Sequence, residues 1–374
     1  MASPDPTAPT HATTFLTIDL DAVAANYRLL AREAVPAQCG AVIKADGYGL
    51  GVMPVARTLR SAGCSEFFVA HLDEGILLRE TMAADGSECR IHVFNGLMQG
   101  KEEEFAAHDL MPVLNDLGQI ERWAAFCRRE DGRPATVHFD TGMSRLGLPP
   151  AETDILLDEP ARLDGFPLRC IISHLACAET PKHPLNKEQQ RRFAAIAGRL
   201  PDAIASLAAS SGIFLGPDWH FDLVRPGVSL FGVAPTKGKP NPMTQVVSLH
   251  GKIIQVRDVD APQTVGYGAT HQFTGPARLA TVAAGYADGY LRSLSGRGSA
   301  YIGDTAVPVV GRVSMDLISL DITNAPPVVP GDTVELIGPH YDLDAIAADA
   351  GTIGYEILTS IGRRYHRRYL GGAA

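Results

Sequence analysis

The stretch CGAVIKADGYGLGVMPVARTL, residues 39–59, joins an apolar run to a glycine-rich turn and then to a segment with helical spacing. Residues 39–44 have the composition of a buried strand, and Met53, Ala56 and Leu59 recur as on one face of a helix. A strand, a short turn and a helix in this order form the unit from which parallel sheets are built. This stretch therefore predicts a βα unit.

Similar units recur from residue 39 to about residue 227, where short β-rich runs alternate with helix-like stretches. Eight parallel strands close a TIM-like (β/α)8 barrel, and we predict an α/β fold of that kind for this part of the chain. The predicted strands lie at 39–44, 66–71, 90–95, 111–115, 136–140, 169–174, 203–208 and 221–225.

The composition changes after Gly232, where APTKGKPNPM (234–243) is rich in Pro, Gly and Lys, as linkers between domains are. Beyond it, short alternating runs separated by Gly, Pro and Asp predict a mainly β C-terminal domain. We expect a flexible tail over residues 1–13, a barrel domain over 14–236 and a C-terminal β domain over 237–374.

The composition excludes several classes of function. With 45% hydrophobic and 20% charged residues, the 374-residue chain has ordinary globular usage. Its 33 basic and 42 acidic residues give a net charge of −9 without a long basic run, which argues against nucleic acid or a membrane surface as a partner. No window has the roughly 18 uninterrupted apolar residues of a membrane span. We expect a soluble protein that acts on a small molecule.

Cysteine and histidine usage indicates a cytoplasmic protein without a metal site. The six cysteines form no CxxC pair, so free thiols are favoured over disulfides or zinc ligands. The 12 histidines form no HExxH motif. The N-terminal stretch MASPDPTAPTHATT lacks the basic and apolar regions of a secretory signal.

Polar residues end several predicted strands, where barrel enzymes place their active sites. Lys44 ends the first strand, Asp140 the fifth, His174 the sixth and Arg225 the eighth. Partial burial would lower the pKa of Lys44 and favour the neutral amine that forms Schiff bases. The alternatives are a lysine that reaches into solvent, an aspartate that caps a turn and a histidine satisfied in the core.

Glycine-rich turns suggest a phosphate site. Gly47, Gly49 and Gly51 surround Tyr48 and permit close approach of a ligand, although the order differs from a P-loop and the GxGxxG spacing is absent. The turns at 210–212 and 225–227 follow the seventh and eighth strands, where such barrels often bind a phosphate group. We therefore expect a phosphorylated cofactor rather than ATP or a dinucleotide.

Taken together, several motifs resemble those of the alanine racemase family, which pairs a TIM-like barrel with a C-terminal β domain and uses pyridoxal 5′-phosphate (PLP). The resemblance implies racemisation of L- and D-alanine by a two-base mechanism that supplies D-alanine for peptidoglycan. The motifs, in family order, are AVIKADGYGLG (41–51), DTGMSRLG (140–147), ISHLACAE (172–179), DLVRPGVSLFG (222–232), VGYG (265–268), GYADGY (285–290), GRVSMD (311–316) and TIGYE (352–356).

The resemblance also implies roles for the catalytic residues. Lys44 would hold PLP as a Schiff base and act as one acid/base group, and Tyr267 would be the other, reaching the site from the second subunit of a homodimer. His174 beside Tyr267, with Arg225 behind it, would tune the pKa of that tyrosine. Arg225 would face the pyridine nitrogen, keep it unprotonated and so favour reprotonation over decarboxylation.

The remaining carried-over positions concern the two ends of the ligand. Tyr48, Ser211, Gly227, Val228 and Tyr355 match phosphate-binding positions. The substrate carboxylate end, the entrance and the supporting positions match Arg145, the partner chain's Met315, Tyr286, Arg312 and Asp316.

Three positions depart from the family pattern. His138 stands where many members have a carbamylated lysine that holds the arginine matching Arg145, and imidazole forms no such stable carbamate. We expect neutral His138, or a small anion beside it, to orient Arg145. Leu207 replaces a frequent histidine behind Arg225, and Ser314 replaces a frequent cysteine.

Three alternative functions remain at this stage. A PLP-dependent decarboxylase of basic amino acids is disfavoured by Arg225, because strong carbanion stabilisation prefers a carboxylate at the pyridine nitrogen. A non-catalytic PLP carrier of the related single-domain family would not need a β domain bearing Tyr267 and Met315. A racemase of broader specificity, or one for serine or lysine, stays open, because the sequence does not display the size of the pocket.

Overall fold

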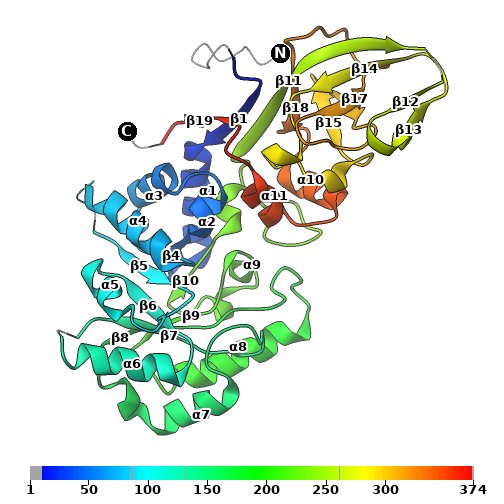
Figure 1. Cartoon of the computed structure of the whole chain (residues 1–374). Coiled ribbons are helices and arrows are strands. Elements are labelled where there is room, and N and C mark those ends of the chain that lie inside the picture. The colour runs from blue at the N-terminus through cyan, green and yellow to red at the C-terminus, as the bar shows by residue number, and fades with distance from the viewer. Residues whose placement is uncertain (1–10, 85, 87, 131, 261, 373–374) are drawn as a thin grey trace.

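The computed structural model describes residues 11–84, 86, 88–130, 132–260 and 262–372. Figure 1 shows a part built from strands and surrounding helices, coloured blue to green, beside a second part with long strands, coloured mostly light green to red. The tail expected over residues 1–13 falls mainly on residues 1–10, which lie outside the described ones.

The first part is a parallel barrel. Its sheet has the order β3-β4-β5-β6-β7-β8-β9, and a separate parallel pair joins β2 to β10. The amides of Gln38 and Gly40 donate to the carbonyls of Asp222 and Val224, and that of Arg225 donates to Ala208, so β10 bridges β2 and β9 and closes the ring. The strands are β2 (Gln38–Cys39), β3 (Ala41–Val42), β4 (Glu66–Val69), β5 (Arg90–Val93), β6 (Met111–Leu114), β7 (Ala135–His138), β8 (Leu168–Ile172), β9 (Ile204–Ser206) and β10 (Leu223–Val224).

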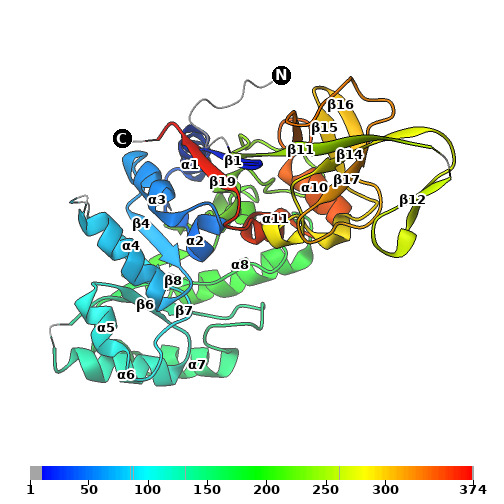
Figure 2. The same cartoon turned by 45° about the horizontal axis from the view of Figure 1, so that its top comes forward.

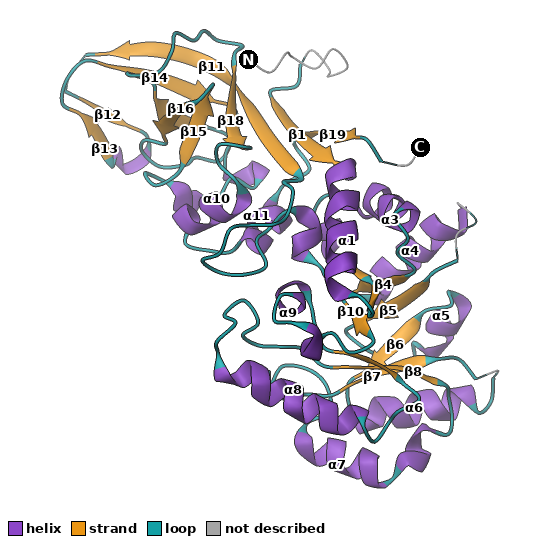
Figure 3. Ribbon diagram, turned by 180° about the vertical axis from the view of Figure 1, so that it is seen from behind, coloured by secondary structure: helices purple, strands orange, loops and turns teal. Residues whose placement is uncertain are grey.

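The predicted fold class is thereby confirmed, since each of the eight predicted runs overlaps one barrel strand, the first of them divided into β2 and β3. Helices cover the outside of the sheet (Figure 3). They are α1 (Leu20–Ala34), α3 (Val52–Ser61), α4 (Leu72–Ala84), α5 (Glu102–Ala107), α6 (Leu117–Cys127), α7 (Pro150–Asp158) and α8 (Pro184–Ala197). Two short helices, α2 (Lys44–Tyr48) and α9 (Ser210–Ile213), follow the carboxyl ends of β3 and β9.

Helix α3 differs in one respect from its sequence pattern. Ala56 and Leu59 are completely buried, but Met53, expected on the same face, is 41% exposed, and Val52 and Val55 fill the first turn of the buried face instead. Valine and leucine at these positions pack against the barrel, and Met53 is rotated toward solvent.

The C-terminal region is mainly β, as predicted. One sheet has the order β16-β15-β18-β11-β1-β19, with β14 joining β11 and β17, and β12 pairs with β13. Its strands are β11 (Val247–Val259), β12 (Gln263–Val265), β13 (His271–Phe273), β14 (Ala277–Val282), β15 (Ser299–Ile302), β16 (Thr305–Pro308), β17 (Ile318–Asp321), β18 (Thr333–Ile337) and β19 (His366–Leu370). Helices α10 (Leu343–Ala350) and α11 (Gly354–Ser360) complete it, together with 3-10 turns at Tyr267–Ala269, Tyr286–Asp288 and Arg292–Leu294. The barrel part has further 3-10 turns at Pro160–Leu163, Pro217–Trp219 and Val228–Phe231.

The first strand, β1 (Thr14–Asp19), lies in this C-terminal sheet although it precedes the barrel in sequence. It pairs antiparallel with β11 and parallel with β19, so the first and the last strand of the described chain lie side by side. Figure 2 shows β19 beside β1 and close to α2 and α3 of the barrel. Among the described residues, no helix is both long and apolar enough to cross a membrane.

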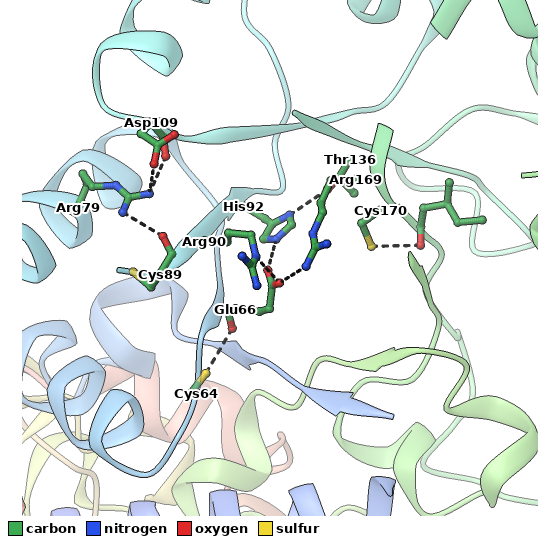
Figure 4. Close-up of polar contacts among 11 residues, drawn as sticks. Cys64, Glu66, Arg79, Cys89, Arg90, His92, Asp109, Thr136, Arg169 and Cys170 are labelled. Carbon is green, nitrogen blue, oxygen red and sulfur yellow. Dashed lines mark hydrogen bonds and ion pairs between the residues drawn. The ribbon is translucent and has the colours of Figure 1, made fainter. Parts of the chain in front are cut away.

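A buried ionic cluster lies at the amino ends of the barrel strands (Figure 4). Glu66 Oε1 accepts hydrogen bonds from Arg90 Nε at 2.5 Å and Arg169 Nη2 at 3.0 Å. Glu66 Oε2 lies 2.9 Å from His92 Nε2, whose ring also contacts Thr136 through Nδ1. Burial opposes the charge on Glu66, but the hydrogen bond and charge of His92 and the two arginines outweigh it and lower the pKa of Glu66 to about 2.

We predict that Glu66→Ala lowers the free energy of unfolding by about 2–3 kcal/mol at neutral pH, because His92 and the arginine pair lose their acceptor. The loss should shrink at acid pH, since the stabilisation exists above the usual pKa of a glutamate and disappears as the pH falls toward 2. Urea unfolding measures it. The control Glu121→Ala removes an exposed ion pair with Arg162 and should cost less than about 1 kcal/mol; equal losses in both variants would contradict the prediction.

Candidate active site

A cavity of about 630 Å³ lies at the carboxyl ends of the barrel strands. It gathers residues from the turns after β3, β7, β8, β9 and β10 and from α11, which belongs to the C-terminal region. Among the residues singled out from the sequence, its lining includes Lys44, Tyr48, His138, Arg145, His174, Ser211, Arg225, Gly227, Val228 and Tyr355.

The backbone after Lys44 turns in the left-handed sense. Ala45, Asp46, Gly47 and Tyr48 have φ angles of 54°, 55°, 62° and 55°. For residues other than glycine this conformation costs roughly 1–2 kcal/mol each. The amides of Gly49 and Gly51 close the turn on the carbonyls of Ala45 and Asp46, at 2.7 and 2.8 Å. Strain of this kind is typical of functional sites and requires support from the surrounding structure.

Lys44 occupies an environment that favours its neutral amine. Burial and then the nearby positive charge of Arg145 lower the pKa of Lys44, while the carboxylate of Glu74 acts in the opposite direction. A lysine with a lowered pKa keeps more of its amine unprotonated near neutral pH, which makes it a better nucleophile and base.

Arg225 is 2% exposed and is held by neutral partners. Its Nη1 donates to Ser206 Oγ, its Nη2 donates to the Ser173 carbonyl at 2.7 Å, and its Cζ lies 5.9 Å from the centre of the Phe68 ring. Burial lowers the pKa of Arg225 to about 10, which leaves the guanidinium protonated at neutral pH. A full positive charge thus faces the cavity.

His138 and His174 are buried beside these cations. For His138, burial and then Arg225 lower the pKa to about 3. For His174, burial followed by Arg225 and Arg145 also lowers the pKa to about 3. Both imidazoles are therefore neutral at physiological pH and can accept a hydrogen bond on one ring nitrogen.

Asn115 fixes the tautomer of His138. The Nδ2 atom of Asn115 donates to the carbonyls of Phe94 and Val113, at 3.1 and 2.8 Å, so its Oδ1 faces His138 Nδ1 at 2.8 Å as an acceptor. His138 Nδ1 must then carry the proton, and Nε2 keeps a free lone pair. His138 has the properties of a neutral acceptor in the cavity wall.

Asp140 caps the turn that precedes Arg145. Its Oδ1 accepts from the amides of Gly142, Met143 and Ser144, at 2.9, 2.9 and 3.1 Å. The capping interpretation of Asp140 is thus the one that the hydrogen bonds support, and the carboxylate orients the backbone from which Arg145 enters the cavity.

The opposite end of the cavity is built from short turns. Ser210 Oγ accepts from the amides of Gly227 and Ser229, at 3.0 and 3.3 Å. A Cβ atom at Gly227 would lie 2.3 Å from Tyr48 Oη, so only glycine permits this approach. Burial raises the pKa of Tyr48, which keeps its hydroxyl a donor.

These residues fit a planar cofactor with an anionic group. Lys44, Arg145 and Arg225 bring three basic side chains to the cavity lining, against the single carboxylate of Glu179. Hydroxyl groups at Tyr48 and Ser211 and the start of α9 offer hydrogen-bond donors to a phosphate group. This donor set suits PLP, and a cavity of this size is typical of small-molecule sites. Lys44 supplies a primary amine to the same lining.

The other residues singled out from the sequence do not line this cavity. Tyr267, Tyr286 and Met315 are 72%, 42% and 53% exposed on the C-terminal region, and we call them the exposed tyrosine cluster. The amide of Tyr286 donates to Ser314, and that of Ala287 to Met315. Two supporting residues lie nearby: Arg312 beside the turn at 266–268, and Asp316 in an ion pair with Arg364 at 2.8 Å.

Sequence reasoning missed Asn115, Ser173 and Ser206. Each lies in or at the end of a predicted strand, where a polar residue in an apolar run is the available signal. Leu207, which stands where many family members have a histidine behind the arginine, is completely buried. Arg225 bonds instead to the hydroxyl of the preceding residue, Ser206.

Comparisons with known proteins agree with this architecture. Residues 18–235 match the family model "Alanine racemase, N-terminal domain", and residues 246–369 match "Alanine racemase, C-terminal domain". An alanine racemase of Rhodospirillum rubrum is 50% identical over 96% of both chains. A protein of Mesorhizobium japonicum named "Alanine racemase, catabolic" is 47% identical over 96% of this chain and 93% of its own.

Among solved structures, an alanine racemase from Bartonella henselae with covalently bound pyridoxal phosphate has a TM-score of 0.92 and 41% sequence identity. The match covers 96% of this chain and all of that one.

We predict that His138 and His174 stay neutral from about pH 8 to about pH 5, because their pKa values lie well below the usual range. NMR titration of histidine-labelled protein, assigned with His138→Gln and His174→Gln, measures this. His340 is the control, since its hydrogen bond with Glu335 raises its pKa and it should titrate. Protonation of either buried ring above pH 5 would contradict the prediction.

Proposed function

This chain belongs to the alanine racemase family, and from that premise we propose that it binds pyridoxal 5′-phosphate through Lys44 and interconverts L- and D-alanine. The observation that carries the proposal is the cavity at the carboxyl ends of the strands. Its lining contains Lys44, Arg225 and the hydrogen-bond donors of the turns after β9 and β10. When bound, the cofactor withdraws electrons from the α-carbon of an amino acid and so makes its α-proton removable.

Lys44 and Arg225 have separate roles in this proposal. The lowered pKa of Lys44 equips its amine to hold the cofactor and to move the α-proton on one face of the substrate. Arg225, fixed by Ser206 and Ser173, keeps its own proton and would donate a hydrogen bond to the cofactor ring without protonating it. Electron withdrawal is then limited, which favours return of a proton over loss of carbon dioxide.

We propose that Arg145 binds the substrate carboxylate and that neutral His138 orients it. The Nε2 lone pair that Asn115 leaves on His138 suits an arginine N–H. At position 138, a neutral imidazole would then do what a negatively charged carbamylated lysine does in many members of the family. His174 lies in the same lining and would adjust the pKa of the opposite base.

The second base is proposed to be Tyr267 of the partner subunit. In one chain Tyr267 is 72% exposed and lies outside the cavity, together with Met315 and Tyr286. An exposed aromatic and apolar cluster of this kind is typical of an interface between copies, and a two-fold homodimer would bring it to the partner's cavity. Arg312 and Asp316 would hold the turns that carry these residues.

The primary test is incubation of the PLP-loaded protein with L-alanine in D2O. We predict loss of optical rotation with uptake of deuterium at Cα and no release of carbon dioxide, because each base exchanges its proton with solvent. An untouched alanine with bound PLP would overturn the substrate assignment, and serine, lysine, ornithine and arginine would then be screened. Carbon dioxide release would indicate the decarboxylase.

Shared sites are tested by mixing two inactive variants, Lys44→Ala and Tyr267→Phe, under conditions that exchange subunits. A mixed dimer carries both defects in one site and none in the other, so a statistical mixture should recover about a quarter of wild-type activity. Either variant alone is the control. If each site took both bases from one chain, no activity would return.

His138 is tested by its effect on substrate binding. We predict that His138→Ala raises KM for alanine about tenfold with a smaller change in kcat, since the residue orients a binding group rather than moving a proton. Steady-state kinetics with and without chloride separate a direct role from one exercised through a bound anion. A KM indifferent to both the substitution and chloride would contradict the proposal.

We also propose a cytoplasmic enzyme whose D-alanine supplies peptidoglycan. All six cysteines are free thiols, which a reducing compartment preserves. Deletion of the gene from its host should then create a requirement for D-alanine in the medium. If the deletion strain grew without added D-alanine but could no longer use alanine as its carbon source, the enzyme would have a catabolic role, as the name of the Mesorhizobium relative states for that protein.

A further inference from the structure

The left-handed turn after Lys44 is held from the barrel side by Glu74. This residue lies in the first turn of α4, and its side chain points back across the strand ends. Glu74 Oε1 accepts from the amide of Ala45 at 2.6 Å, while Oε2 accepts from the amides of Ala70 and His71 at 2.7 and 3.1 Å. One carboxylate therefore joins the turn after β3 to the turn after β4.

The same turn is held from the other side by the last strand of the chain. Arg367 Nη1 donates to the carbonyl of Gly49 at 2.7 Å, and Tyr369 Oη donates to that of Leu50 at 2.8 Å. A Cβ atom at Gly51 would lie 2.4 Å from Tyr369 Oη, so glycine is required for this contact. Because β19 belongs to the C-terminal sheet, two parts of the molecule meet on the segment that follows Lys44.

Both supports act on a backbone that would not keep this conformation alone. Ala45, Asp46 and Tyr48 all have side chains and all lie in the left-handed region. Isolated residues of this type revert to other conformations unless their surroundings determine them. Lys44 immediately precedes them, so the direction in which the chain leaves Lys44 fixes where its amine can reach in the cavity.

We propose that Glu74, Arg367 and Tyr369 are positioning residues, which together hold the 45–51 turn so that Lys44 keeps its place against the cofactor. The proposal rests on the proposed function in so far as Lys44 binds PLP. In this proposal strand β19 has two roles: it belongs to the C-terminal sheet, and it helps to hold the turn that positions Lys44.

Hydrogen exchange of the PLP-loaded protein, followed by mass spectrometry, tests the support directly. In Glu74→Gln the side chain keeps one acceptor oxygen and gains an NH2 donor, so it cannot serve both the Ala45 amide and the Ala70 and His71 amides. We expect peptides covering residues 44–52 to exchange about tenfold faster or more. Tyr369→Phe, which loses only the hydroxyl, should speed exchange in the same peptides by about twofold to fivefold.

Asp73→Asn is the matched control. It removes the same charge from the neighbouring, exposed position of α4, and within the part of the chain that the structure describes the turn is bonded by Glu74 and not by Asp73. Its exchange in residues 44–52 should stay within about twofold of the wild type. Equal acceleration in Asp73→Asn and Glu74→Gln would overturn the proposal, because a general charge effect would then explain both.

Cofactor retention and kinetics distinguish positioning of Lys44 from a purely structural role. Glu74→Gln should release PLP about tenfold faster in gel filtration and lower kcat, with KM for alanine within about twofold because Arg145 is untouched. Faster exchange with unchanged PLP retention and kcat would overturn the proposal. If the wild type itself failed to retain PLP or to racemise alanine, the proposed function would fail, while the exchange data would still decide whether these residues hold the turn.

Discussion

The closure of the barrel between β10 and β2 is the constraint on which the site depends. The amides of Gln38, Gly40 and Val42 bond to the carbonyls of Asp222, Val224 and Pro226, which lie far along the chain. These bonds bring the segment that carries Arg225 and Gly227 beside the strand that ends at Lys44. Without closure, Arg225 and Lys44 would belong to opposite edges of an open sheet.

Closure also explains the electrostatics of the cavity. It places Lys44, Arg145 and Arg225 around one volume and buries Arg225 among neutral partners. The uncompensated positive charge lowers the pKa values of both buried histidines and supplements the effect of burial on Lys44. An anionic ligand then supplies the negative charge that the protein leaves out, so binding and tuning of the site come from the same residues.

The sequence predicted what depends on local pattern. The barrel strands are continuous apolar runs, and residues such as Lys44 and Arg225 follow them directly, so the strand-end rule brings them together. Pairing of β1 with β11 and β19 depends on distant segments and left no local sign. The same holds for Glu74, which has the position of an ordinary helix-start acid. Of the three apolar residues singled out in α3, Ala56 and Leu59 are buried and Met53 is exposed.

The place of β1 bears on how the protein folds as it is synthesised. Among the described strands, β1 is synthesised before the others, but its partners β11 and β19 come only after the whole barrel and near the end of the described chain. The nascent barrel can close while β1 still has two unpaired edges, and such edges attract other strands. Strand β19 therefore does more than complete a sheet: when it pairs with β1, the growing chain no longer exposes this aggregation-prone edge.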